Sequence, residues 1–68
     1  MVNRPAWARE LAAKMALEGV QQTDIARHYN VSRQYVSNVL AGRSKGKAEG
    51  TAYITDALAA IKAERGSQ

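Results

Sequence analysis

The sequence contains no cysteine and no phenylalanine, and His28 is the one histidine among its 68 residues. A chain without cysteine forms no disulfide framework, no cysteine-ligated zinc site and no thiol nucleophile. A single histidine supplies neither a cluster of metal ligands nor a supported catalytic pair. Paired carboxylates, a glycine-rich phosphate loop and a nucleophile elbow are also missing. We therefore predict that the protein is not an enzyme and uses no metal or other cofactor.

Long hydrophobic runs are absent as well. No stretch approaches the roughly 18 apolar residues that a membrane-spanning helix needs, and residues 1–5 lack the apolar core of a signal peptide. We therefore expect a soluble, cytoplasmic protein with no membrane partner. A chain of 68 residues buries only about 60% of the surface that its unfolded form exposes. We expect residues 1–68 to form a single domain without a pocket for a small-molecule effector.

What the sequence does have is alanine, 13 residues in all, within a hydrophobic fraction of 46%. Alanine favours helices, and no alternating β-branched run or Asn-Gly turn indicates a strand. Apolar residues that recur every three or four positions predict helices over residues 5–18, 22–29, 33–41 and 51–64. The basic, glycine-containing stretch over 42–47 is typical of a loop. The predicted fold class is all-α, a compact bundle of four, or at most five, short helices.

Residues 22–42 hold two of these helices, joined by the turn Asn30-Val31-Ser32. A helix-turn-helix needs a small residue where its helices cross, which Ala26 supplies. The turn needs a residue that accepts left-handed dihedral angles, as Asn30 does, and an apolar residue to fill the corner, which we assign to Val31. Ser32 is a suitable N-cap for the next helix. The pattern therefore predicts a helix-turn-helix.

This segment resembles a known DNA-binding unit through residues at fixed offsets. These residues are Gln22, Ala26, Asn30, Val31, Ser32, Val36 and Val39. Their spacing is similar to that of the helix-turn-helix in the phage-repressor-like family, which includes lambda repressor, Cro and the XRE regulators of phages and mobile elements. Two features depart from the family, since asparagine stands at the usual glycine of the turn and many members have five helices. The resemblance implies a lambda-repressor-like fold that binds double-stranded DNA as a homodimer.

The outward face of the helix over 33–41 carries the candidate base contacts. On a helical wheel Gln34, Ser37 and Asn38 lie on one side, with Arg33 at its N-terminal flank. This face has hydrogen-bonding side chains and no acid, which suits a helix in the major groove, where amides read adenine and arginine reads guanine. The resemblance implies base contacts at the same four positions. The alternative is a polar face that meets only solvent.

Net charge is the second indication of a DNA partner. The chain carries +4, and all of it lies between residues 22 and 47, where five basic residues face Asp24 alone. Cations there would neutralise phosphates and release counterions, so that binding would depend steeply on salt. The candidate phosphate contacts are Thr23, Tyr35, Arg43, Lys45 and Lys47, and the resemblance to the phage-repressor-like family implies a further phosphate contact by Gln22 at the N-terminus of the helix over 22–29. For Tyr35 a place at the edge of the core is an equal alternative, and for the loop over 42–47 the alternative is a solvated linker.

The helix over 51–64 is the candidate for contact with a second copy of the chain. One small helix-turn-helix contacts one half-site, so family members usually pair and place two recognition helices about 34 Å apart. The side chains that we assign to this contact are Ile54, Leu58 and Ile61. The alternative is that they close the core of the monomer.

These features together predict a transcription regulator, a repressor or autoregulator that binds a pseudo-palindromic operator as a homodimer. An antitoxin of a toxin–antitoxin pair or an excision-type factor is the alternative within DNA binding. A helical adaptor that binds another protein through residues 54, 58 and 61 is the alternative from a different class. RNA is a weaker candidate, because the sequence shows no aromatic platform on which bases could stack.

Overall fold

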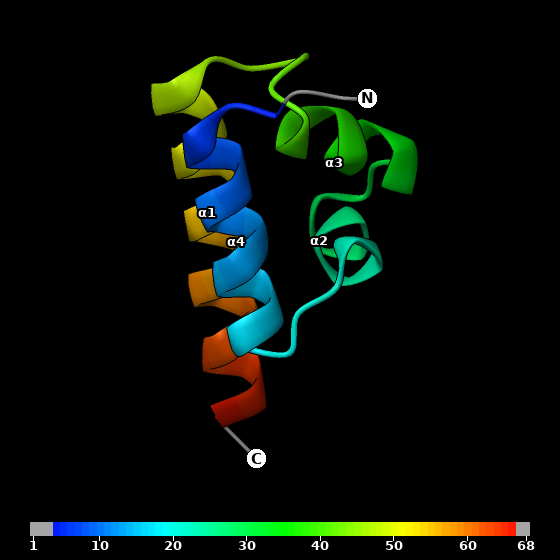
Figure 1. Cartoon of the computed structure of the whole chain (residues 1–68). Coiled ribbons are helices and arrows are strands. Elements are labelled where there is room, and N and C mark those ends of the chain that lie inside the picture. The colour runs from blue at the N-terminus through cyan, green and yellow to red at the C-terminus, as the bar shows by residue number, and fades with distance from the viewer. Residues whose placement is uncertain (1–3, 67–68) are drawn as a thin grey trace.

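Four α-helices form the protein in the computed structural model, which describes residues 4–66 (Figure 1). They are α1 (Ala6–Leu17), α2 (Gln22–Tyr29), α3 (Arg33–Leu40) and α4 (Lys47–Gly66). No strand occurs in this range, so the predicted all-α class with four helices is confirmed. The first three and last two residues of the predicted domain lie outside the described residues. No helix within 4–66 has both the length and the apolar character needed to cross a membrane.

One hydrophobic core joins the four helices. α1 and α4 run side by side in the same direction, and α2 and α3 lie together on one side of them (Figure 1). Leu11 and Met15 of α1 are buried against this core, and aliphatic side chains of the other three helices complete it. Among the described residues, the core contains no buried polar or charged side chain. Hydrophobic burial therefore fixes how α2 and α3 are presented to solvent.

The three side chains predicted to contact a second copy belong to this core. Ile54 is fully buried, and Leu58 and Ile61 are only 2% and 6% exposed. Side chains that the monomer already encloses cannot form a surface for another chain. The predicted dimer contact is therefore corrected at these residues, which close the core of the monomer.

α4 begins at Lys47, earlier than the start near Thr51 that the sequence predicted. Gly50 lies in its first turns, and a Cβ added there would stand 2.7 Å from two ring carbons of Trp7. Glycine has a low helix propensity, which concealed this part of the helix in the sequence. Packing of the Trp7 ring against the glycine backbone offsets that low propensity. The loop before α4 is correspondingly shorter than predicted.

The turn between α2 and α3 is held by its backbone. Asn30 has φ 56° and ψ 46°, the left-handed conformation that the sequence predicted. The N–H of Val31 donates to the carbonyl oxygen of Ala26 at 2.9 Å. Ser32 Oγ accepts a hydrogen bond from the N–H of Tyr35 at 3.1 Å, which confirms the predicted N-cap of α3. These bonds fix where α3 starts relative to α2.

Val31 does not fill the corner between α2 and α3, so this prediction is wrong. Val31 is 37% exposed, whereas Ile25 of α2 and Val36 of α3 are fully buried. The apolar side chains that join these helices to the core thus lie within the helices. Val31 lies in the turn, outside both helices, and so does not belong to the helical faces that point toward the core.

Candidate nucleic-acid interface

The outer face of α3 carries the four residues predicted to contact bases. Arg33 and Gln34 are exposed, and Ser37 and Asn38 are half-buried. Gln34 Nε2 donates a hydrogen bond to Asn38 Oδ1 at 3.3 Å, one turn further along the helix. This bond leaves the Gln34 carbonyl oxygen and the Asn38 amino group for other partners, an acceptor and a donor that match the donor and acceptor of an adenine edge. The structure therefore brings the four side chains together on a face without an acid.

The chain leaves α3 through a left-handed glycine that fixes the position of the next cation. Gly42 has φ +78°, and its N–H donates to the carbonyl oxygen of Val39 at 3.1 Å. The N–H of Arg43 donates to the carbonyl oxygen of Asn38 at 3.0 Å. These two bonds form the Schellman pattern that ends many helices. The exposed side chain of Arg43 therefore extends from a fixed point at the C-terminal end of α3.

Lys45 and Lys47, the other predicted phosphate contacts of the loop, differ in their surroundings. Lys47 is exposed at the first residue of α4, whereas Lys45 is half-buried. The Lys45 ammonium lies 5.1 Å from the centroid of the Tyr53 ring, which is a cation–π contact. This contact ties the loop to α4, so Lys45 is not part of a freely solvated linker.

The three tyrosines meet where α2, α3 and α4 converge. The rings of Tyr29 and Tyr53 stack with centroids 4.1 Å apart, and Tyr35 meets Tyr53 edge-on at 6.0 Å. The Tyr29 hydroxyl donates to the Tyr53 carbonyl oxygen at 2.6 Å. Burial raises the pKa of Tyr53, and the neighbouring Tyr35 and Tyr29 raise it further. Burial also raises the pKa of Tyr29, with a smaller contribution from the negative charge of Asp56. Tyr35 therefore lies at the edge of the core, while its phosphate contact stays a prediction.

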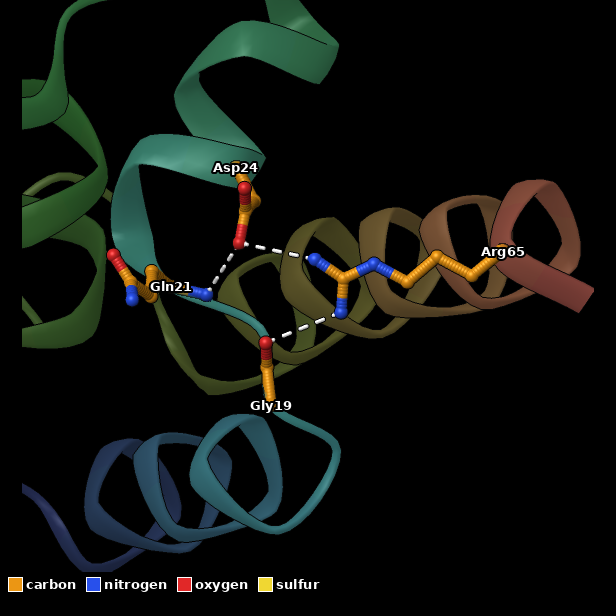
Figure 2. A network of polar contacts seen from close by, with 4 residues as sticks. All are labelled: Gly19, Gln21, Asp24 and Arg65. Atoms are coloured by element: carbon orange, nitrogen blue, oxygen red, sulfur yellow. Dashed lines mark hydrogen bonds and ion pairs between the residues drawn. The ribbon is translucent and has the colours of Figure 1, made fainter.

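Gln22 and Thr23 lie in the first turn of α2. Gly19, Gln21, Asp24 and Arg65 form a small polar network at the same end of the helix (Figure 2). Thr23 is exposed and Gln22 is half-buried. Asp24 Oδ2 accepts a hydrogen bond from the N–H of Gln21 at 2.8 Å, as in a capping box. The first N–H groups of a helix have no acceptor within it, so this end of α2 offers donors to an anion.

Arg65 joins this network, although the sequence placed it outside the candidate interface. Its Nη2 lies 3.4 Å from Asp24 Oδ2, and its Nη1 donates to the carbonyl oxygen of Gly19 at 3.1 Å (Figure 2). Arg65 follows Asp24 by 41 residues, and the predicted fourth helix ended at residue 64. In the sequence, the apolar pattern of the fourth helix was the one signal for this contact. The pattern predicts the helix, but the direction in which that helix runs beside α1 is known only from the fold.

The candidate phosphate contacts thus form two groups joined by α3. Gln22 and Thr23 lie near the last turn of α4, because the ion pair between Asp24 and Arg65 connects α2 to that turn. Lys45 and Lys47 lie at the opposite end, at the first turns of α4. α3 follows α2 through the turn and ends beside the loop. Comparison with known protein families, with curated proteins and with solved structures gives no match to this chain.

Proposed function

We propose that the protein binds double-stranded DNA sequence-specifically, with α2 and α3 acting as a helix-turn-helix and α3 entering the major groove. The observation that carries this proposal is the outer face of α3, where Gln34 and Asn38 are paired and no acidic residue occurs. An α-helix fits the width of the major groove. Support also comes from the net charge of +4, all of it between residues 22 and 47.

The proposal divides the two kinds of contact between segments. Arg33, Gln34, Ser37 and Asn38 read base edges from α3. The start of α2 and the loop before α4 bind phosphates, which positions the protein but carries no sequence information. The residues in this second role are Gln22, Thr23, Tyr35, Arg43, Lys45 and Lys47. Substitutions in the two groups should therefore alter different properties of the complex.

The biological role that we propose is a phage-repressor-type transcription regulator in the cytoplasm, a repressor or autoregulator. Two copies would place their α3 helices about 34 Å apart on a pseudo-palindromic operator. Because Ile54, Leu58 and Ile61 lie in the core, contact between the copies uses another surface. An antitoxin or an excision-type factor would use the same DNA-facing residues. The burial of the three side chains argues against an adaptor that binds protein through them.

Selection of bound duplexes from a random library tests the proposal, and we expect the chain to enrich a defined sequence. Gln34→Ala should relax the preference at one base position by about 1–3 kcal/mol and leave binding to random-sequence duplex nearly unchanged. Lys47→Ala should weaken binding to every duplex by a similar factor and lower the salt dependence by about one ion. Failure to enrich any sequence, or identical behaviour of the two variants, would contradict the proposal.

Sedimentation of the chain with the selected duplex tests the homodimer. We expect two chains per duplex when both half-sites are present, and a loss of tight binding when one half-site is scrambled. One chain per duplex at saturation, with an affinity that does not depend on the second half-site, would show that the protein binds as a monomer.

A further inference from the structure

Asp24 is the one acidic residue between positions 22 and 47, and it lies in the first turn of α2. Its carboxylate supports folding, because it accepts the Gln21 N–H and places a negative charge at the N-terminus of a helix. The same charge opposes DNA binding, since Gln22 and Thr23 precede it directly and a phosphate there would meet a like charge. One carboxylate thus has opposite effects on folding and on the proposed contact.

Arg65 compensates this charge from the last turn of α4. Its guanidinium bridges Asp24 Oδ2, at 3.4 Å, and the Gly19 carbonyl oxygen, at 3.1 Å (Figure 2). The Arg65 side chain is 50% exposed, against 22% for that of Asp24. The cation of this ion pair is therefore more exposed to solvent than the anion. The bridge also joins the turn between α1 and α2 to the end of α4.

We infer that Arg65 is a positioning residue for the phosphate contact at the N-terminus of α2. It cancels the charge of Asp24, so that Gln22 and Thr23 meet a phosphate without repulsion. The inference rests on the proposed DNA binding and deepens it. It adds to the interface a residue that lies far outside the helix-turn-helix in the sequence.

Lys62 provides a matched control on the same helix. It pairs with Glu18, just after α1, with 3.6 Å between Lys62 Nζ and Glu18 Oε1. Lys62→Gln and Arg65→Gln each remove one positive charge and one ion pair from the C-terminal half of α4. Only Arg65→Gln leaves an unpaired carboxylate at the N-terminus of α2. A difference between the two variants therefore reports the position of the charge and not the net charge.

The experiment measures binding of the full chain to a fluorescently labelled random-sequence duplex between about 50 and 200 mM KCl. Arg65→Gln should weaken binding about fivefold or more, because an uncompensated carboxylate faces the DNA, and Lys62→Gln by less than about twofold. Asp24→Asn should tighten binding about two- to fivefold, because the amide oxygen of the new side chain can still accept the Gln21 N–H while the repulsion is gone. The double variant Asp24→Asn/Arg65→Gln should bind within about twofold of the wild type.

Equal weakening by Arg65→Gln and Lys62→Gln, or a double variant as weak as Arg65→Gln, would overturn the inference. Weaker binding of Asp24→Asn would also overturn it, since a purely structural ion pair predicts that result. Circular dichroism checks that each variant is folded, and Arg65→Lys, which keeps the charge, should bind within about threefold of the wild type. If the wild-type chain shows no salt-dependent binding to the duplex, the proposed function itself fails. If it binds and the variants do not differ, only the role of Arg65 fails.

Discussion

Gly50 is the residue on which the close approach of α1 to α4 depends. A Cβ at this position would stand 2.7 Å from two ring carbons of Trp7. Gly50→Ala should therefore lower the free energy of unfolding by about 1–3 kcal/mol, because the indole must move. Gly66→Ala is the matched control in the same helix, where nothing lies within 4 Å of the added carbon, and it should leave stability unchanged or slightly higher. Urea unfolding followed by circular dichroism measures both, and equal effects would contradict this account of the contact.

The hydroxyls of Tyr29 and Tyr53 differ in what they contribute. Tyr29 donates to the Tyr53 carbonyl oxygen, whereas the buried Tyr53 hydroxyl has no hydrogen-bond partner in the part of the chain that the structure describes. Tyr29→Phe should lower the free energy of unfolding by about 0.5–1.5 kcal/mol, and Tyr53→Phe should leave it unchanged or raise it. Chemical denaturation of the two variants compares them. A loss for Tyr53→Phe as large as that for Tyr29→Phe would mean that the Tyr53 hydroxyl is paired in solution.

Two features of single residues were predictable because they involve only backbone that is close in the sequence. The left-handed conformation of Asn30 and the cap by Ser32 follow from local stereochemistry and were predicted. Val31 was assigned incorrectly and the contact of Arg65 was missed, because the surroundings of both depend on residues distant in the sequence. The exposure of Val31 depends on how the helices fill the core, and the contact of Arg65 depends on the direction of α4 beside α1.

The start of α3 is capped by the side chain of Ser32. Ser32 Oγ accepts the N–H of Tyr35, and Ser32→Ala should lower the free energy of unfolding by about 1 kcal/mol. Ser32→Asp retains an accepting oxygen and should keep stability near that of the wild type. Its charge at the N-terminus of α3 should nevertheless weaken binding to duplex DNA by at least about tenfold. Thermal unfolding and a duplex titration separate the two effects, and unchanged binding by Ser32→Asp would place α3 away from the DNA.

The helices themselves were largely predictable, and their ends less so. The predicted range 22–29 is that of α2, and the range 33–41 differs from α3 by one residue, since turn-forming residues bound both helices. The start of α4 was missed because Gly50 has a low helix propensity and its packing partner, Trp7, belongs to another helix. The outer face of α3 was predictable from its period. The position of its base-reading candidates relative to the start of α2 could not be predicted from the sequence and is known only from the fold.

Ile54, Leu58 and Ile61, which the sequence assigned to a dimer contact, belong to the single hydrophobic core of the chain. Leu58 is 2% exposed in the single chain. Leu58→Ala should therefore lower the free energy of unfolding by about 2–5 kcal/mol, by the same amount at every protein concentration. Denaturation at protein concentrations that span about two decades measures this. A loss that grows on dilution would return Leu58 to an interface between chains.

The proposed function places DNA against the start of α2, the outer face of α3 and the loop after it. Backbone amide chemical shifts of the ¹⁵N-labelled chain, recorded while duplex DNA is added, report which residues lie against the DNA. We predict that the largest changes fall on residues 22–24, 33–38 and 42–47, with small changes in α1 and in the middle of α4. Changes centred on α1 or on the outer side of α4, or no changes at all, would contradict this placement.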